Sequence, residues 1–245
     1  MSGHSKWSKI KHKKGAADSK KGAVFTKLGN AITVAAKAGG GDADMNFNLR
    51  LAMDKAKQAN MPKENIERAI KRGTGELSGQ SPEETTYEGF AAGKIPIIIE
   101  CLTDNKNRTV SEIKHILEKN SGAMAGPGSV MWQFEKKGCL SASAKAMADK
   151  LRVNNNEDLE LKLIDFNIED IQINNDEVII YTKPEQLQQV KQNLENQGIK
   201  IESTGIEFVA KEKIEVSNEQ GEKISKLFEE LDEQQDVSNY YTNIA

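Results

Sequence analysis

Short apolar segments with regular spacing run through most of this chain, and they limit the folds that it can adopt. No apolar run approaches the ~20 residues that a helix needs to span a bilayer. Only 37% of the residues are hydrophobic, whereas 29% are charged. The 245 residues are enough for one large domain or for two to three small ones. We therefore expect several small hydrophobic cores rather than a single large core.

The first 75 residues predict three short helices. Apolar residues at helical spacing indicate a helix from about Phe25 to the glycines at 39–41, and a second helix near 46–60. A third helix is opened by Pro62, which a first turn tolerates, and is ended by Gly73. Glycine ends a helix readily because it adopts the left-handed cap conformation at little cost. Three short helices with short connections favour a small helical bundle.

The rest of the chain alternates between strand and helix patterns. A polar stretch at 75–84, rich in glycine and serine, is typical of a linker. The strand–helix–strand units that follow favour two ferredoxin-like domains, and with them an α+β fold class. The expected strands are 95–102, 129–134, 140–143, 168–173, 178–181 and 206–209. Four helices are expected. One begins at a capping box at 109–112, one covers 159–166, one starts at Pro184, and one begins at a second capping box at 217–220.

Several residues of this second part can be interpreted individually. Pro96 indicates either the beginning of its strand or an edge position, because proline cannot donate to the strand ladder. Trp132 falls in an expected strand, and we expect it in the core. Cys101 and Cys139 lie far apart in strand-like contexts, which favours buried free thiols over a disulfide. For the polar loop at 104–108, turn and cap chemistry and a binding role both remain open.

Positive charge is concentrated at the start of the chain. Residues 1–27 hold eight lysines and one aspartate, a net charge of +7, whereas the whole chain has a net charge of −3. Counted over longer stretches, residues 1–75 carry +10 and residues 76–245 carry −13. A basic arm on an otherwise acidic protein indicates a polyanion as partner, although a solvated arm without a partner is the alternative.

The predicted nucleic-acid-binding residues are basic or aromatic. Lysine suits phosphate and reads bases poorly, while an aromatic ring among lysines could stack on an unpaired base. For the basic residues in the last turn of the third helix, compensation of the helix dipole is the alternative reading. The full set is Lys6, Trp7, Lys9, Lys11, His12, Lys13, Lys14, Lys20, Lys21, Lys27, Arg68, Lys71 and Arg72.

The last helix carries acidic residues on the face opposite its apolar residues. We expect this face to be exposed, where it would either meet a protein partner or only keep the protein in solution. The acidic residues are Glu229, Glu230, Asp232 and Glu233.

Signatures of catalysis and of cofactor binding are missing from the sequence. The nearest approach to a phosphate loop, at 89–95, fails the spacing and lacks the hydroxyl residue. The glycines at 126–128 lack the third glycine that a dinucleotide-binding fingerprint requires. None of the three histidines pairs with a cysteine or acid at metal-ligand spacing, and His115 is expected on a helix surface. We therefore predict no catalytic residue, no metal, no cofactor and no enzyme activity. The N-terminus lacks the apolar core of a signal peptide, so a cytoplasmic location and no membrane partner are expected.

Several motifs resemble those of the YebC/PmpR family. The similarity covers the whole chain and is densest over the first 138 residues, and the motifs together are far more specific than any one of them. They are GHSKW at 3–7, IKHKK at 10–14, FTKL at 25–28, GGGD at 39–42, DKAKQANMPKENIERAIKRGTGE at 54–76, YEGF at 87–90, ECLTDNKNRT at 100–109 and GSVMWQFEKKG at 128–138.

The resemblance implies an N-terminal helical domain followed by two α+β domains. The last domain is inserted into the other, so that the C-terminal helix returns to the middle domain. The implied boundaries are 1–76 for the helical domain, 81–134 with 207–245 for the middle domain, and 135–206 for the inserted domain.

The resemblance also implies a nucleic-acid-binding regulator of gene expression. A DNA-binding transcriptional regulator is the first expectation, because family members are described in this way. A ribosome-associated translation factor that contacts RNA is the alternative, because mitochondrial relatives activate translation of cytochrome oxidase and some bacterial ones act at the ribosome. The charge of the chain does not separate DNA from RNA, because lysine recognises the phosphates of both.

The sequence departs from the family pattern in three places. Residues 91–94 are poorer in glycine and proline than is usual, Pro96 stands where a small apolar residue is common, and residues 144–157 diverge. A role for the middle-domain loop at 87–94 is therefore not carried over to this chain.

Overall fold

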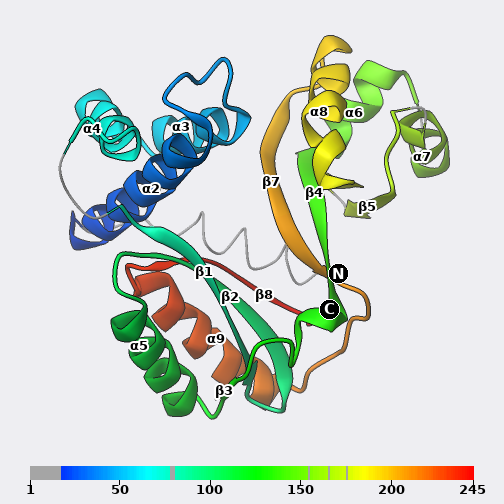
Figure 1. Ribbon diagram of the computed structural model, residues 1–245. Helices are drawn as coiled ribbons and strands as arrows, with labels where there is room; N and C mark the ends of the chain where they lie inside the picture. Colours follow the sequence, from blue (N-terminus) through cyan, green and yellow to red (C-terminus); the bar gives the residue numbers. More distant parts are fainter. Residues whose placement is uncertain (1–17, 78–80, 154, 165, 175) are drawn as a thin grey trace. The chain divides into compact units, whose positions relative to one another are not determined.

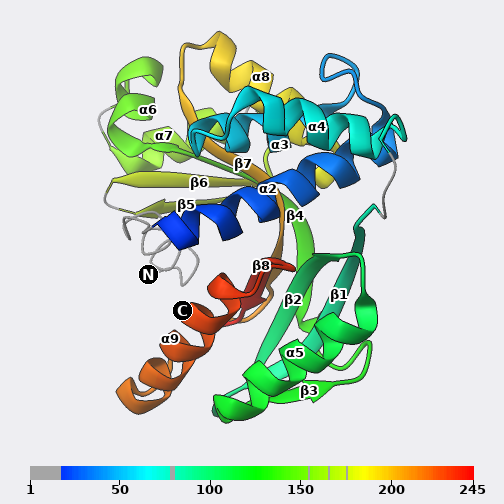
Figure 2. The ribbon, with the colours of Figure 1, turned by 90° about the vertical axis from the view of Figure 1, so that its left-hand side faces the viewer.

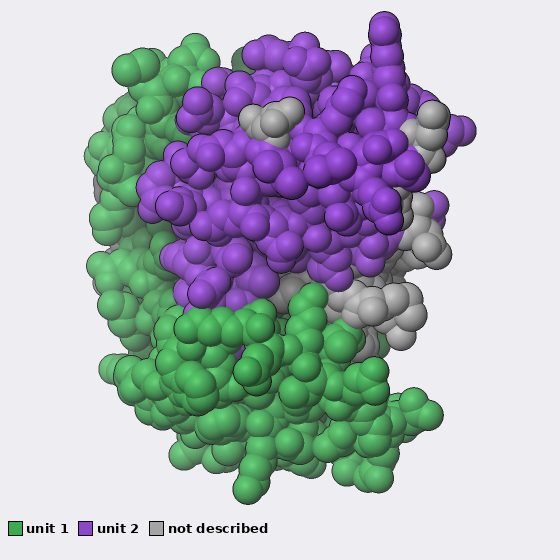
Figure 3. Space-filling view, turned by 90° about the vertical axis from the view of Figure 1, so that its right-hand side faces the viewer, with its two compact units in different colours: residues 1–133, 210–245 green, residues 134–209 purple. Residues whose placement is uncertain are grey.

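The computed structural model describes residues 18–245 except 78–80, 154, 165 and 175; the side chains of 18–21 and 156 are also outside the description. The fold is α+β, with a helical N-terminal region followed by two mixed α+β regions (Figure 1). The chain forms two compact units: residues 1–133 with 210–245 are unit 1, and residues 134–209 are unit 2 (Figure 3). Within the described residues, no helix is long and apolar enough to cross a membrane.

Three helices form the N-terminal region, as the sequence predicts. They are α2 (Asp18–Gly39), α3 (Phe47–Gln58) and α4 (Lys63–Gly73). Figure 2 shows α3 and α4 beside α2, and both contact it. The buried residues that join them are apolar and follow helical spacing on each helix. They include Ile32, Ala36, Leu49, Ala56, Ile66 and Ala69.

Gly73 ends α4 at a point where this helix touches α2. A Cβ atom at Gly73 would overlap the carbonyl oxygen of Thr33 and lie 2.7 Å from the Cβ of Ala36. The change Gly73→Ala is therefore expected to force the helices apart and to lower the free energy of unfolding by about 1–3 kcal/mol. Gly22→Ala is the matched control, because no atom lies within 4 Å of a Cβ there. Urea unfolding measures both changes, and an equal loss of stability would contradict this account of the contact.

The first α+β region is a four-stranded sheet with two helices. The strands have the order β3-β1-β2-β8, and the pairings β1–β2, β1–β3 and β2–β8 are antiparallel. The hairpin strands β1 and β2 lie in the centre, and a helix precedes each outer strand, which is the ferredoxin-like arrangement with permuted connections. The elements are β1 (Glu83–Ala91), β2 (Ile95–Thr103), α5 (Lys106–Lys119), β3 (Ala123–Ala125), α9 (Asn218–Glu233) and β8 (Val237–Thr242).

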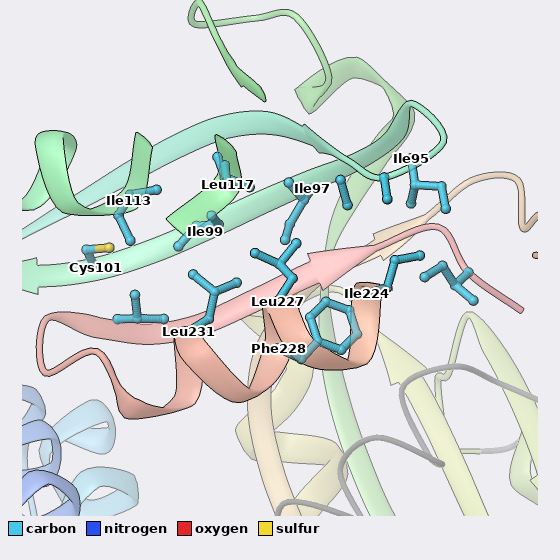
Figure 4. Close-up of a cluster of buried hydrophobic side chains, with 14 residues drawn as sticks. Ile95, Ile97, Ile99, Cys101, Ile113, Leu117, Ile224, Leu227, Phe228 and Leu231 are labelled. Atoms are coloured by element: carbon cyan, nitrogen blue, oxygen red, sulfur yellow. The ribbon is translucent and has the colours of Figure 1, made fainter. Parts of the chain in front are cut away.

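The core of this sheet lies between β2 and the two helices. Figure 4 shows Leu227 and Leu231 of α9 pointing toward β2, where Ile97 and Ile99 belong to the same buried cluster. All nine residues of β2 are buried, and alternate side chains of a strand point to opposite faces, so both faces of this strand are covered. On the N-terminal side, α2 contacts β2 and β8. Pro96 precedes the pairing with β8, so it marks the beginning of a central strand, and the edge interpretation is wrong.

Unit 2 is a second ferredoxin-like sheet. Its strand order is β5-β6-β4-β7, again with a helix before each outer strand. Because the chain leaves unit 1 after Gln133 and returns to it at Ala210, unit 2 is an insertion. Its elements are β4 (Phe134–Ser143), α6 (Ala144–Leu151), α7 (Asn156–Ile164), β5 (Asp170–Asn174), β6 (Glu177–Thr182), a 3-10 turn η2 (Pro184–Gln186), α8 (Leu187–Asn196) and β7 (Ile201–Ala210). The finer division into three domains, at 1–76, 81–134 with 207–245, and 135–206, stays a prediction.

Two local predictions were wrong, one because of a distant residue and one because of a nearby cap. The strand expected at 129–134 is a turn and a 3-10 helix, η1 (Met131–Gln133). The carboxylate of Glu88 accepts hydrogen bonds from backbone N–H groups here, which a strand would have used for its ladder. The capping box expected at 109–112 is also wrong, because α5 begins earlier and is capped by Asn105. The second capping box, Ser217 with Gln220, is confirmed.

Candidate nucleic-acid interface

Exposed cations of the helical region lie on α3 and α4, and Lys37 in the last turn of α2 is exposed as well. Arg68 and Lys71 of α4 are exposed, as expected for phosphate contacts. Lys57 and Lys63 are exposed too, and lie 3.8 Å from Asp54 and 3.5 Å from Glu67. Exposed ion pairs of this kind contribute little free energy, so these lysines can exchange a carboxylate for a phosphate. Lys57 and Lys63 were not in the predicted set. Both lie on helices whose last turns are basic, and this pattern indicates them as candidates for phosphate contacts.

Arg72 is held differently from the other predicted cations of α4. It is half-buried, and its Nη2 atom donates to Oδ1 of Asn30 at 2.9 Å. Within the described part of the chain, its Nε atom is buried without a hydrogen-bond partner. The guanidinium thus fastens α4 to α2, and a phosphate contact by Arg72 stays a prediction.

Lys27 contacts the end of α9. Its ammonium group donates to the carbonyl oxygen of Asp232 at 2.7 Å and lies 3.5 Å from that of Leu231. A cation is stabilising at the C-terminus of a helix, where carbonyl groups lack intrahelical donors. Lys27 therefore has a structural contact within unit 1, in addition to the predicted role, which stays a prediction.

The basic arm lies outside the described residues. For two further predicted residues, the backbone belongs to α2 but the side chains are not described. The predicted residues of the arm are Lys6, Trp7, Lys9, Lys11, His12, Lys13 and Lys14, and the two residues of α2 are Lys20 and Lys21. Their binding role stays a prediction from sequence.

The acidic face of α9 is only partly exposed. Glu229 and Glu233 are exposed, as predicted. Glu230 is half-buried and forms an ion pair of 3.1 Å with Lys119 of α5. Asp232 is half-buried and accepts from the Tyr240 hydroxyl at 3.2 Å. The expectation of four exposed acids is wrong for these two, because α9 packs against α5 and β8.

A buried carboxylate organises the polar loop at the start of α5. Asp236 is 7% exposed and accepts from the hydroxyls of Thr103 at 3.2 Å and Thr109 at 2.7 Å. Arg108 donates to Asp236 at 2.9 Å and to Asp104 at 3.1 Å. Turn and cap chemistry therefore accounts for this loop. The sequence did not predict the cluster, because Asp236 is more than a hundred residues from its partners.

A polar cavity of about 610 Å³ adjoins this cluster. Its lining includes the carboxylates of Asp104, Glu112 and Asp236 and the guanidinium groups of Arg72 and Arg108. The carboxylates outnumber the arginines, and both arginines already donate to acceptors of the protein. The cavity therefore does not suit a phosphate group.

Trp132 is 68% exposed, so the prediction that it lies in the core is wrong. It stands in η1, on the loop that Glu88 holds. The glycines and proline at 126–128, which are typical of a turn, were the signal that this segment is not a strand.

Both cysteine thiols are buried, and burial raises the pKa of each. Cys101 and Cys139 are buried and free, as predicted. Burial raises the pKa of the Cys101 thiol to about 12, and it raises the pKa of Cys139 as well. A search of the described residues finds no group of three or more His, Cys, Asp or Glu side chains that could hold a metal. His115 is exposed on α5, as predicted.

Comparisons with known proteins cover the whole length. Two family models match: "TACO1/YebC protein N-terminal domain" at residues 5–76 and "TACO1/YebC second and third domain" at residues 82–244. A probable transcriptional regulatory protein of Acidithiobacillus ferrooxidans is 48% identical, with 99% of this chain and 94% of the relative covered. A relative with the same name from Natranaerobius thermophilus is 43% identical, with 99% and 96% covered. The crystal structure of a conserved hypothetical protein from Aquifex aeolicus matches with a TM-score of 0.84 and 40% identity, covering 98% and 96%.

Proposed function

This chain belongs to the TACO1/YebC family, and from this we propose that it is a nucleic-acid-binding regulator of gene expression. The first candidate is a DNA-binding transcriptional regulator, because its relatives are named probable transcriptional regulatory proteins. These names describe a regulator, which supports a protein without enzyme activity. The cytoplasm, where a regulator of this kind meets its target, belongs to the same proposal.

The observation that carries the proposal is the division of charge along the chain. Residues 1–75 have a net charge of +10, and residues 76–245 have −13. In the described part of the basic region, α3 and α4 expose Lys57, Lys63, Arg68 and Lys71. Such a segment attracts the phosphate backbone of a nucleic acid.

A ribosome-associated translation factor that contacts RNA is the second candidate. The exposed cations of α4 are suited to phosphates, and the helix lacks Arg, Asn and Gln side by side, the arrangement that reads bases in a major groove. Weak sequence specificity is compatible with either nucleic acid. A protein partner at α9 also remains part of the proposal, with Glu229 and Glu233 as the exposed acids.

The two candidates differ in where the protein is found in the cell. A lysate is separated on a density gradient with and without RNase, and DNA recovered with the protein is tested for promoters. Promoter enrichment with an unchanged light fraction supports the transcriptional regulator. Sedimentation with ribosomes that is lost after RNase supports the translation factor.

The double change Arg68→Ala and Lys71→Ala tests the part of the interface on α4. If both side chains contact phosphates, the log–log salt slope for duplex DNA should flatten by up to about 1.8, and affinity at 0.15 M salt should fall by up to about thirtyfold. Lys183→Ala with Lys200→Ala is the matched control, because it removes the same charge from exposed positions of unit 2. Fluorescence anisotropy of a labelled duplex measures both. Equal losses in the two variants would show an effect of net charge and not a contact by α4.

A further inference from the structure

Trp132 is exposed to an extent that the fold does not require. It is 68% exposed, and among the described residues it is the only aromatic side chain that counts as exposed. The other aromatic residues are buried or half-buried, including Phe134 only two positions away. A tryptophan that is this exposed leaves most of its large apolar surface available to a partner.

The loop under Trp132 is held by a buried carboxylate. Glu88 comes from β1 and is 7% exposed. It accepts from the backbone N–H groups of Gly128 at 2.6 Å, Val130 at 2.7 Å and Met131 at 2.9 Å. Burial by itself would raise the pKa of Glu88, but these three donors outweigh it and hold the pKa below its ordinary value. The loop is therefore fixed on the sheet, and Val130 is fully buried beneath it.

The indole ring is also fixed, with its polar atom occupied. Nε1 of Trp132 donates to the carbonyl oxygen of Ser129 at 3.1 Å. The ring needs no further hydrogen bond, so it offers its flat apolar surface rather than a donor. A fixed ring of this kind loses little conformational entropy when it binds a planar group.

The surroundings of the ring allow a polymer backbone to approach. The loop residues at 126–129 are exposed, and a Cβ at Gly128 would meet no atom within 4 Å. Lys211 is exposed beside the loop, because its backbone N–H donates to the carbonyl oxygen of Gln133 at 2.9 Å. The backbone of Lys211 thus lies one residue from Trp132, and the two residue types together are those with which proteins bind unpaired nucleotides: an aromatic ring stacks on the base and an ammonium group meets the phosphate.

We propose that Trp132 is a stacking platform for an unpaired base of a single-stranded nucleic acid, and that Glu88 positions it. The proposal rests on the proposed function as a nucleic-acid-binding protein, and it adds a second contact within unit 1, separate from the basic arm. A duplex keeps its bases stacked inside, so this contact favours single strands over duplexes. It therefore gives the protein a preference that charge alone does not give.

The two tryptophans of the chain allow a direct test. The change Trp7→Phe leaves Trp132 as the only tryptophan, and this variant is titrated with a labelled single-stranded decanucleotide and with a duplex of the same length. The label reports binding by anisotropy, while tryptophan fluorescence reports contact with the ring. Binding of the single strand should quench Trp132, and binding of the duplex should leave its emission nearly unchanged.

Substitutions then measure how much the ring contributes. Trp132→Ala should weaken single-strand binding by about 5- to 150-fold, since stacking contributes about 1–3 kcal/mol per base, and Trp132→Phe should retain most of the affinity. Glu88→Gln should increase the quenching of Trp132 by iodide and weaken single-strand binding. Glu84→Gln is its control, because Glu84 is an exposed carboxylate on the same strand.

The results separate the platform from the proposed function. Single-strand binding that leaves Trp132 emission unchanged and survives Trp132→Ala would overturn the platform alone. If the wild-type protein with both tryptophans binds neither nucleic acid, both the platform and the proposed function fail. Equal quenching by single strand and duplex would also overturn the platform, because a paired base cannot stack on the ring.

Discussion

Replacing Lys9, Lys11, Lys13 and Lys14 with alanine is expected to weaken binding to duplex DNA by up to about a thousandfold at 0.15 M salt. Each lysine that neutralises a phosphate adds about −0.9 to the log–log salt slope, so four such contacts account for about −3.6. The loss is largest at low salt and shrinks as the salt concentration rises. Anisotropy titrations of a labelled duplex at four salt concentrations measure both the affinity and the slope.

A control with the same change of net charge separates contact from charge. Lys145, Lys150, Lys183 and Lys200 are exposed in unit 2, and their replacement by alanine removes four positive charges from a region without a predicted nucleic-acid contact. This control should change the slope little. A wild-type slope and affinity in the arm variant would show that the arm is not the contact. The exposed cations of α3 and α4 would then be the remaining candidates.

Asp236→Ala is expected to lower the free energy of unfolding by about 1–3 kcal/mol. Thr103 and Thr109 are almost fully buried. The change leaves the Thr103 hydroxyl without its acceptor, whereas the Thr109 hydroxyl still has the carbonyl oxygen of Asn105 at 3.0 Å. A buried donor that loses its acceptor costs about 1–3 kcal/mol. The ion pair with Arg108 is broken as well, but the Arg108 side chain is 44% exposed, so its loss adds little. Urea unfolding should show a lower midpoint with an unchanged slope.

Asp104→Ala is the matched control for this cluster. Asp104 contacts the same Arg108 at 3.1 Å, but its side chain is 47% exposed. Exposed ion pairs contribute about 0–1 kcal/mol, so this variant should unfold near the wild-type midpoint. If Asp104→Ala and Asp236→Ala destabilise equally, the ion pair and not the buried hydroxyls holds the cluster together.

Helices with regular apolar spacing were predictable, whereas polar strands were not. The three N-terminal helices and α9 each bury residues three and four positions apart, and this period is visible in the sequence. In β1, by contrast, the first five residues are exposed or half-buried, and residues 83–84 fall in the stretch at 75–84 that was predicted as a linker. The strand β8 was also missed, because its central residues are serine, asparagine and tyrosine. Both strands pair with β2, whose residues are distant in sequence from β8.

In the candidate site, too, local sequence patterns were predictable and contacts between distant residues were not. Basic residues could be identified from charge alone, but their partners could not. Lys27 reaches the end of α9, some two hundred residues away, and the loop of Trp132 depends on a glutamate forty residues earlier. Such contacts connect segments whose separation in the sequence leaves no local pattern. Sequence reasoning therefore finds the residues that meet a partner outside the chain more readily than those held by distant parts of the same chain.

The insertion of unit 2 also sets an order of events during synthesis. All four strands of unit 2 are complete once residue 210 has left the ribosome, so this unit can fold while translation continues. The sheet of unit 1 begins with β1 but needs β8, whose last residue is Thr242. Until then β2, the most apolar strand, has one open edge and lacks the cover of α9. The open edge of β2 is therefore left unpaired through the synthesis of more than a hundred residues, and an unpaired apolar edge can pair with another chain.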